Sequence, residues 1–276
     1  MTLLLIMIEI VHISDLHYGS GSEFKLNLLE GIIDYINDLN PDAVVCTGDL
    51  VHKGRPDQYA EVRAILRTIN KSIPLMIVPG NHDLKNSGIV QFERYIGPRR
   101  SKLVLEDLDT LIVGLCSAKD DVSEGELGDE QLEWLARQFN ENLENRIIAL
   151  HHHVIAVPYS GRIHATLLDA GELIEITQLF EVDLVLMGHK HIPHAWVLGS
   201  CTFLYCGTST STKSRADDDP SFNLIHLDQK NLEVYLINSR NFNKQLLLRR
   251  KQGKTEFIRP RRTRIEHLIN SRIFLD

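Results

Sequence analysis

The sequence predicts an α/β protein in which two β-sheets pack against each other. Over the first two thirds of the 276 residues, short apolar runs alternate with helix-length amphipathic segments, a pattern typical of β-α-β units. The apolar runs contain few polar positions, as strands do when both faces of their sheet are covered. After residue 183 the helical segments stop and strand-like runs follow one another closely, so we expect a second, more antiparallel sheet. No Pro/Gly/Ser linker divides this body. We assign residues 1–240 to one domain and 241–276 to a basic C-terminal extension.

Each element is predicted from its own local pattern. Strand-like runs lie at residues 3–13, 43–47, 75–78, 110–116, 147–150, 184–187, 195–198, 202–206, 223–227 and 232–237. The first run has no basic residues before it and no small-residue cleavage site, so we interpret it as a buried strand and expect a cytoplasmic protein. Helical spacing of apolar residues predicts helices at 24–39, 57–69, 129–139 and 170–180, with Ser22 and Asp129 as N-caps.

The charges are distributed unevenly along the chain. The net charge is -7, yet the residues from Lys244 onward include ten Lys/Arg and only three Asp/Glu, so the rest of the chain is strongly acidic. An overall acidic chain gives no sign of a dedicated nucleic-acid binder, and the tail lacks a pattern of aromatic residues for stacking on bases. We interpret the tail as a solvated extension or an arm that forms a homodimer, with binding of an anionic polymer as the alternative. No apolar run is long enough to span a membrane.

The four cysteines are interpreted as buried thiols. Cys46, Cys116, Cys201 and Cys206 show no C-x-x-C spacing, and the first two lie in strand-like apolar runs. This pattern favours reduced side chains over a disulfide framework or a thiolate metal site.

Residues able to bind a metal lie where strand-like runs end. In an open α/β sheet, ligands bind outside the carboxyl ends of the strands, so we expect these side chains to meet in one region. The spacings Asp-x-His and His-x-His put both side chains of a pair on the same side of an extended segment. Glycines beside them allow the chain to turn tightly. Five strand ends supply the candidates Asp15, His17, Asp49, Asn81, His82, His151, His189 and His191.

This set of oxygen and imidazole donors suits two borderline cations such as Mn, Fe or Zn. The Cys-rich ligation usual for structural zinc is absent from it. Two such ions about 3.5–4 Å apart can hold both the attacking and the leaving oxygen of a phosphoryl displacement. Each motif alone is more often a surface pair or an ordinary turn. Their joint occurrence after five strand-like runs is what indicates a binuclear metal centre.

With these blocks in this order, the sequence resembles the calcineurin-like metallophosphoesterases, and more closely their cyclic-nucleotide-phosphodiesterase-like (class III) branch. The family pattern is D-x-H, G-D, G-N-H-D/E, a histidine after a strand, and G-H-x-H, and all five blocks are present between Asp15 and His191. The resemblance implies an α/β fold of the metallophosphoesterase type, an α/β/β/α sandwich of two mixed sheets flanked by helices. It also implies two divalent or mixed-valence metal ions that hydrolyse a phosphodiester or phosphomonoester, with cyclic nucleotides as the leading candidate, by in-line attack of a metal-bound hydroxide.

The resemblance assigns roles to individual positions. Asp15, His17 and His191 would hold one metal, Asn81, His151 and His189 would hold the other, and Asp49 would bridge the two. His82 would act near the phosphate as a general acid or as a stabiliser of developing charge, and Asp83 would orient it through its ring N–H. The fourth block departs from the family pattern because it reads His151-His152-His153-Val154, so His152 is an alternative ligand to His151.

Other functions and weaker signals complete the expectations. The alternatives are a hydrolase of a larger pyrophosphate, lipid-linked or nucleic-acid substrate, which would favour an apolar cap or basic residues around the site, and a non-catalytic protein-binding scaffold, which would lack ligands. His52 is either a site residue or a solvated histidine. Arg162 and His164 belong either to a substrate-facing loop or to a plain surface loop. The hydroxyl-rich segment 207–215, ending in Arg215, is a further candidate for binding phosphate, with a bare loop as the simpler interpretation.

Overall fold

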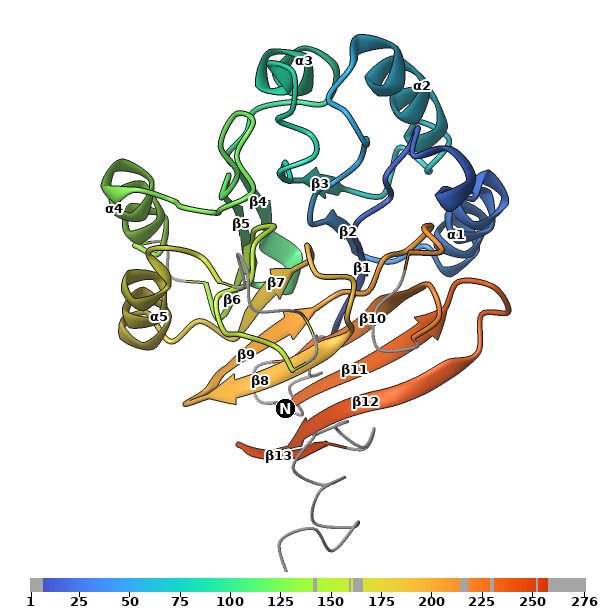
Figure 1. The fold of residues 1–276 in the computed structure, drawn as a ribbon. Helices are drawn as coiled ribbons and strands as arrows, with labels where there is room; N and C mark the ends of the chain where they lie inside the picture. The colour runs from blue at the N-terminus through green and yellow to red at the C-terminus, as the bar shows by residue number, and fades with distance from the viewer. Residues whose placement is uncertain are drawn as a thin grey trace, which may run out of the picture.

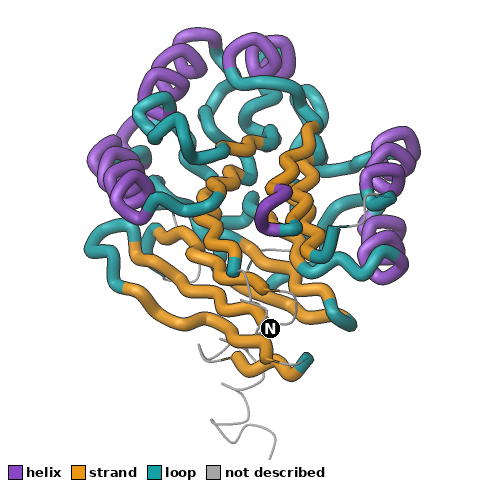
Figure 2. Tube along the Cα trace, turned by 180° about the vertical axis from the view of Figure 1, so that it is seen from behind, coloured by secondary structure: helices purple, strands orange, loops and turns teal. Residues whose placement is uncertain are grey.

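The computed structural model describes residues 7–140, 143–158, 160, 166–213, 218–228, 231–251 and 253–257. Two mixed β-sheets stack face to face and helices cover their outer faces, as Figure 1 and the view from behind in Figure 2 show. The predicted α/β/β/α sandwich is confirmed.

The first sheet has seven strands in the order β13-β12-β11-β10-β1-β2-β3. Its parallel half contains β1 (Ile8–Ile13), β2 (Ala43–Cys46) and β3 (Leu75–Ile77). β10 (Ser221–Asp228) pairs antiparallel with β1, and an antiparallel ribbon continues outward from it. That ribbon consists of β11 (Asn231–Asn238), β12 (Lys244–Lys251) and β13 (Lys254–Phe257).

The second sheet has six strands in the order β4-β5-β6-β7-β9-β8. Its centre is parallel, and its two outermost strands pair antiparallel with their neighbours. The expected grouping of the late strands into one antiparallel sheet is wrong, because the late strands divide between the two sheets. The strands are β4 (Ser101–Leu105), β5 (Thr110–Gly114), β6 (Asn145–Ala149), β7 (Leu184–Met187), β8 (His194–Leu198) and β9 (Cys201–Tyr205).

Five α-helices lie outside the sheets in the part of the chain that the structure describes. The four predicted helices are present as α1 (Leu26–Leu39), α2 (Pro56–Leu66), α4 (Asp129–Gln138) and α5 (Ala170–Leu179). The eight-residue α3 (Gly88–Tyr95) was not predicted, because it is shorter than the stretch over which helical spacing of apolar residues can be recognised. Ser22 lies in a short 3-10 helix, Gly21–Glu23, instead of capping α1. Asp129 is the first residue of α4, and the N-cap position belongs to Gly128.

Strand alternation divides the core into three layers. Side chains such as Ile10, Val45 and Ile147 fill the space between the sheets. Their neighbours in sequence, Val11 and Val44 among them, pack beneath α1, α2 and α3, and α4 and α5 cover a third cluster on the second sheet. This explains why the strand runs are apolar at nearly every position, as the sequence indicated. All four cysteines are buried free thiols.

The basic segment that begins near residue 241 contributes two strands to the sandwich. Leu247 and Leu248 of β12 join the layer between the sheets. The nearly buried Arg250 of the same strand lies 3.6 Å from the carboxylate of Asp183 and donates to the carbonyl of Ser200, so it ties the first sheet to the second. The division at residue 240 was placed where the charge of the sequence changes. In the structure the first sheet continues to Phe257, and the buried Arg250 is accommodated by its pair with Asp183. The remainder of the predicted extension, residues 258–276, lies outside the described residues.

Candidate metal centre

The five sequence blocks meet at the carboxyl ends of β1, β2, β3, β6 and β7. Asp15 and His17 follow β1, Asp49 follows β2, and Asn81 follows β3. Two neighbouring backbone hydrogen bonds fix the first two loops side by side, since the N–H of Asp15 donates to Gly48 at 2.9 Å and that of His17 donates to Asp49 at 2.9 Å. The remaining candidates arrive from the second sheet, so the site spans both sheets of the sandwich.

Asp49 lies between two groups of side chains. Its Oδ2 lies 3.6 Å from Nε2 of His17, while its Oδ1 lies 3.5 Å from Nε2 of His151. On the first side, His17 Nε2 lies 2.9 Å from Nε2 of His191, which in turn lies 3.3 Å from Oδ1 of Asp15. On the second side, the Asn81 Oδ1 lies 3.2 Å from His151 Nε2 and 3.1 Å from His189 Nδ1. These two groups contain the residues that the resemblance divides between two metals, and the division itself stays a prediction.

The hydrogen-bond pattern leaves lone pairs directed at one another. Nδ1 of His151 lies 2.6 Å from the carbonyl of Thr47 and Nδ1 of His191 lies 2.7 Å from the carbonyl of Lys213, and a carbonyl can only accept. In the neutral ring each Nε2 is therefore an unprotonated acceptor that faces further acceptors, the carboxylates of Asp49 and Asp15 respectively. These Nε2 atoms have no proton to donate to the carboxylates that they face, an arrangement that fits a cation bound between them.

Burial and charge act differently on the candidate ligands: they favour neutral His17 and His189 and an ionised Asp15, whereas the pair with Asp15 favours the protonated form of His191. Burial lowers the pKa of the His17 imidazole to about 3, and it holds the pKa of His189 well below its ordinary value. Burial alone would raise the pKa of Asp15, but the neighbouring His191 outweighs it and the pKa falls below its ordinary value. The same reciprocal pair raises the pKa of His191 despite its burial. Neutral imidazoles beside ionised carboxylates are the forms that bind metal.

Glycines in the loops make room for the two carboxylates. A Cβ atom on Gly80 would lie 2.2 Å from Oδ1 of Asp49, and one on Gly188 would lie 2.5 Å from Oδ2 of Asp15. Both distances are shorter than real Cβ contacts allow. The bare backbone at these two positions therefore lets each carboxylate rest against the neighbouring loop.

The geometry favours His151 over His152 as the ligand. Both ring nitrogens of His152 have partners that are not candidate ligands, Ser117 Oγ at 2.9 Å and the carbonyl of Ser123 at 3.2 Å. The Ser117 hydroxyl also accepts the backbone N–H groups of His151 and His152. His152 therefore anchors the loop, while His151 Nε2 faces Asp49 and Asn81.

His82 occupies the expected position, but Asp83 does not orient it. The ring of His82 packs edge-on against His17 with centroids 4.7 Å apart, and its Nδ1–H donates to the carbonyl of His52 at 2.9 Å. The Asp83 carboxylate instead accepts the backbone N–H groups of Val51 at 3.0 Å and Gly80 at 2.9 Å. The expected contact between Asp83 and His82 is therefore absent among these interactions, because Asp83 turns away to clamp the β2 and β3 loops. Burial, then the nearby Asp49, raises its pKa to about 7.

The weaker sequence signals have mixed outcomes. His52 does reach the site, with its ring 5.0 Å from His82 and 5.9 Å from His17. The hydroxyl-rich segment has a structural role, since the hydroxyls of Thr208 and Thr210 donate to the carbonyls of Asp15 and Leu16, each at 2.7 Å. This support for the β1 loop was missed, and a run of small hydroxyl residues after a strand was the available signal. Arg162, His164 and Arg215 lie outside the described residues.

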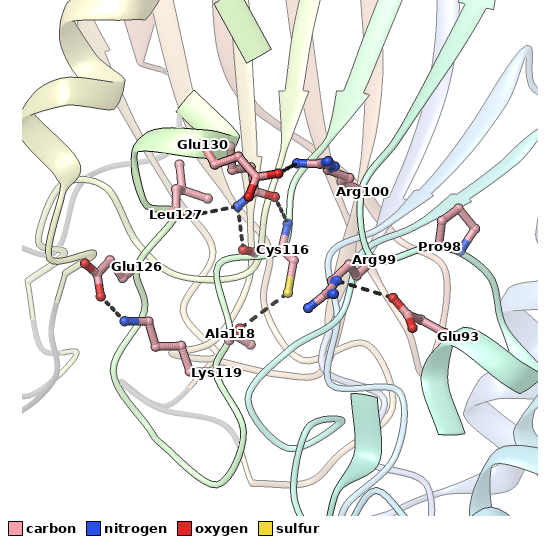
Figure 3. Close-up of a pocket in the computed structure, with 11 residues that line it drawn as sticks. Glu93, Pro98, Arg99, Arg100, Cys116, Ala118, Lys119, Glu126, Leu127 and Glu130 are labelled. Carbon is pink, nitrogen blue, oxygen red and sulfur yellow. Dashed lines mark hydrogen bonds and ion pairs between the residues drawn. The ribbon is translucent and has the colours of Figure 1, made fainter. Parts of the chain in front are cut away.

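A cavity of about 220 Å³ opens onto the centre, and its lining includes Asp49, Asn81, His82, His189 and His191. A larger cavity of about 510 Å³ lies between α3, the start of α4 and the segment after β5 (Figure 3). Its cations are paired with glutamates, Arg99 with Glu93 at 3.3 Å and Arg100 with Glu130 at 3.1 Å. The larger volume therefore does not identify the candidate site. The unprotonated nitrogens and carboxylate oxygens that could bind metal line the smaller cavity.

Comparison with known proteins agrees with this geometry. The family model for calcineurin-like phosphoesterases matches residues 8–193, which is more than half of the chain and includes all seven candidate ligands. This chain belongs to the calcineurin-like phosphoesterase family. The resemblance inferred from the five sequence blocks is thereby confirmed.

Relatives of this calcineurin-like chain carry phosphodiesterase names. A protein of Arcobacter nitrofigilis named "Probable glycerophosphodiester phosphodiesterase GpdQ" is 30% identical over 155 residues, which are 52% of this chain and 56% of that protein. The chain thus matches little more than half the length of that relative. A "Probable cyclic nucleotide phosphodiesterase" of Rhodococcus erythropolis is 26% identical over 251 residues, 79% of each chain.

Solved structures share the fold. A dimetal phosphatase from Danio rerio superposes with a TM-score of 0.66 at 14% identity, covering 91% of this chain and 98% of that one. The purple acid phosphatase PPD1 from yellow lupin gives a TM-score of 0.68 at 15% identity, covering 87% of this chain and 53% of that one. At such identities the likeness shows the fold alone. Among the described residues, no helix combines the length and the apolar character needed to cross a membrane.

Proposed function

We propose that this chain is a two-metal phosphoesterase that hydrolyses a small phosphate ester. The observation that carries the proposal is the position of Asp49, whose two oxygens face His17 on one side and His151 on the other. A carboxylate with a separate group of acceptors at each oxygen is suited to bridge two cations. Family membership and the phosphodiesterase names of the relatives support the same activity.

Seven residues would hold the two metals, which we expect to be Mn, Fe or Zn: Asp15, His17 and His191 on one side, Asn81, His151 and His189 on the other, and Asp49 between them. Such ions supply a low-pKa water and neutralise phosphate charge near neutral pH. The carbonyls of Thr47 and Lys213 orient His151 and His191 by accepting their Nδ1–H groups. This fixes each Nε2 toward the site.

His82 is placed to act on the leaving group. Its ring lines the cavity, its backbone N–H donates to Asp49 at 2.8 Å, and the carbonyl of His52 holds its Nδ1–H. Its Nε2 then faces away from that carbonyl, with Lys85 Nζ 3.2 Å away, and is the nitrogen left to interact with the departing oxygen. It can pass a proton to that oxygen only from the ring form that carries a proton on both nitrogens. Asp83 supports the reaction indirectly by accepting hydrogen bonds from the backbones of Val51 and Gly80. Val51 lies two residues after Asp49, and Gly80 directly precedes Asn81, so these bonds hold the two loops that carry both side chains.

The test uses chelator-stripped protein restored with Mn, assayed on bis(p-nitrophenyl) phosphate and p-nitrophenyl phosphate. Asp49→Ala should abolish both metal binding and hydrolysis. His82→Ala should retain two metals while turnover falls by about 10²–10⁴-fold, the usual contribution of a positioned acid. Full activity in His82→Ala would remove its assigned role, and failure of the wild-type protein to bind metal would overturn the proposal.

A further inference from the structure

The cavity of about 510 Å³ in Figure 3 is separate from the metal centre, because none of the described residues that line it also lines the cavity of about 220 Å³. Arg99 and Arg100, in the loop between α3 and β4, belong to its lining, and we call it the arginine cavity. In Figure 3 the end of the Arg99 side chain points toward Cys116, which also lines the cavity. Its volume lies in the range of about 300–1,000 Å³ that is usual for small-molecule sites.

The two arginines keep hydrogen-bond donors for a ligand although each has a carboxylate partner. Among the described residues, Arg100 donates from Nη1 to Glu130 at 3.1 Å, and Nε of Arg99 lies 3.3 Å from Glu93. A guanidinium carries five N–H groups, so pairing through one nitrogen leaves donors on the others. The side chain of Glu130 is 85% exposed, and exposed pairs of this kind contribute little. An anion that binds Arg100 more strongly can therefore take the place of Glu130.

The chemistry of two neighbouring guanidinium groups favours a phosphate group. The planar fork of arginine binds carboxylate and phosphate oxygens in pairs. A carboxylate has two oxygens, which a single fork can occupy, whereas a phosphate monoester presents three oxygens and carries close to two negative charges. Both Arg99 and Arg100 can therefore engage one phosphate. Pro98, Ala118 and Leu127 also line the cavity and offer apolar surface to the organic part of such a ligand.

The arginine cavity borders the segment that supports the metal-facing loop. Cys116 and Ala118 line the cavity, and Ser117 lies between them in the sequence. The hydroxyl of Ser117 accepts the backbone N–H groups of His151 at 3.3 Å and His152 at 3.1 Å. None of the candidate metal ligands lines the arginine cavity. A ligand bound there therefore meets the support of the His151 loop and not the metal ligands themselves.

We propose that the arginine cavity is a second binding site, which takes a small molecule that carries a phosphate monoester group. Arg99 and Arg100 bind the phosphate oxygens, Glu130 turns into water, and the organic part lies against Leu127. The site shares no lining residue with the metal centre, so this inference does not depend on the activity proposed for that centre.

The experiment titrates phenyl phosphate into the full chain, stripped of metal by a chelator so that no metal competes for the phosphate, and measures the dissociation constant by calorimetry. Arg99→Gln and Arg100→Gln should each weaken binding by about 10-fold, the lower range for a charge-assisted hydrogen bond. Glu130→Gln should strengthen binding by about two- to fivefold, because it removes a competing carboxylate. Arg137→Gln is the matched control, since Arg137 also pairs with a glutamate of α4, Glu133 at 3.6 Å, but lies outside the lining of the cavity.

Two comparison ligands identify the chemistry that the site recognises. Phenyl phosphate should bind more tightly than inorganic phosphate, and benzoate, its carboxylate counterpart, should bind about 10-fold more weakly. Phenyl phosphate should also protect Arg99 and Arg100, but not Arg137, from modification by phenylglyoxal, as measured by mass spectrometry. Absence of binding, wild-type affinity in both arginine variants, or equal affinity for benzoate would overturn the inference. Equal affinity for inorganic phosphate would overturn its small-molecule part. These measurements involve no hydrolysis, so the proposed function stands or fails separately.

Discussion

A methyl group at Gly80 should displace Asp49 in the candidate metal centre, at some cost in stability because it also meets the backbone. The Cβ of an alanine there would lie 2.2 Å from Oδ1 and 2.4 Å from the backbone nitrogen of Asp49, whereas real Cβ contacts essentially never fall below 3.0 Å. The separation must therefore grow by about 0.8 Å at the carboxylate and about 0.6 Å at the backbone nitrogen, the differences between 3.0 Å and 2.2 or 2.4 Å. Metal–ligand distances tolerate only about 0.2 Å, so Asp49 could not keep the bridging position that we propose for it.

We expect Gly80→Ala to weaken metal binding by about 10–100-fold, the range found when residues that support a ligand are changed. That range corresponds to about 1.4–2.8 kcal/mol. Turnover at saturating Mn should also fall by about 100-fold, because a misplacement of about 1 Å has effects of that size. Calorimetric titration of Mn into chelator-stripped protein gives the affinity, and bis(p-nitrophenyl) phosphate gives the turnover.

Gly171→Ala is the matched control. Gly171 lies in α5, and a Cβ there would have no atom within 4 Å, so the same chemical change meets open space. Removing a glycine from a helix should raise the free energy of unfolding by about 0.5–1 kcal/mol and leave metal affinity unchanged. Wild-type metal affinity and turnover in Gly80→Ala would show that Asp49 does not bridge metals in the position described, and the reasoning would fail.

Three further changes test other parts of the structure. His151→Asn should lose one metal and lower turnover by about 10³-fold, while His152→Asn should keep both metals, as metal analysis can establish; the reverse result would exchange their roles. Arg250→Met should lower the free energy of unfolding in urea by about 2–4 kcal/mol, because it removes the cation paired with Asp183 and leaves that carboxylate with the backbone N–H of Arg146 as its hydrogen-bond donor; no change would mean that β12 is not anchored to the second sheet. Burial lowers the pKa of His12 to about 3, so the unfolded chain takes up a proton below pH 6.5 that the folded chain does not. Metal-free protein should therefore lose stability as the pH falls, and His12→Gln should reduce the loss between pH 7 and 5 by about 2 kcal/mol; an unchanged loss would contradict the pKa assignment.

Much of the site could be predicted because its ligands follow strands. The carboxyl ends of parallel strands meet at one edge of each sheet, so residues far apart in sequence, such as Asp15 and His189, were expected together before any contact was known. The four long amphipathic helices were found for a similar reason, since their apolar spacing reports the buried face directly. In both cases a local sequence pattern is informative, because the regular geometry of the strand or helix determines where its side chains lie.

Pairing between distant strands left no comparable signal. Nothing local distinguishes β10, which joins β1, from β9, which joins β7. The basic residues of β12 made this segment resemble a solvated tail. It forms a strand because its arginines pair with distant carboxylates, Arg249 with Glu233 at 2.7 Å and Arg250 with Asp183. The predicted role of Asp83 was wrong for the same reason. It was assigned to its sequence neighbour His82, but its carboxylate accepts backbone N–H groups, one of them 32 residues away.

Backbone conformation is the part of the site that the sequence concealed most completely. Asp15, His17, Asp49, His189 and His191 all have positive φ, between 52° and 77°. Aspartate tolerates this region, but the three histidines incur a cost of about 1–2 kcal/mol each. The loops can hold that strain because neighbouring backbone bonds and the hydroxyls of Thr208 and Thr210 fix the segment after β1. Strain concentrated on the proposed ligands, and supported by residues that contact no substrate, is expected where a site is preorganised for its function.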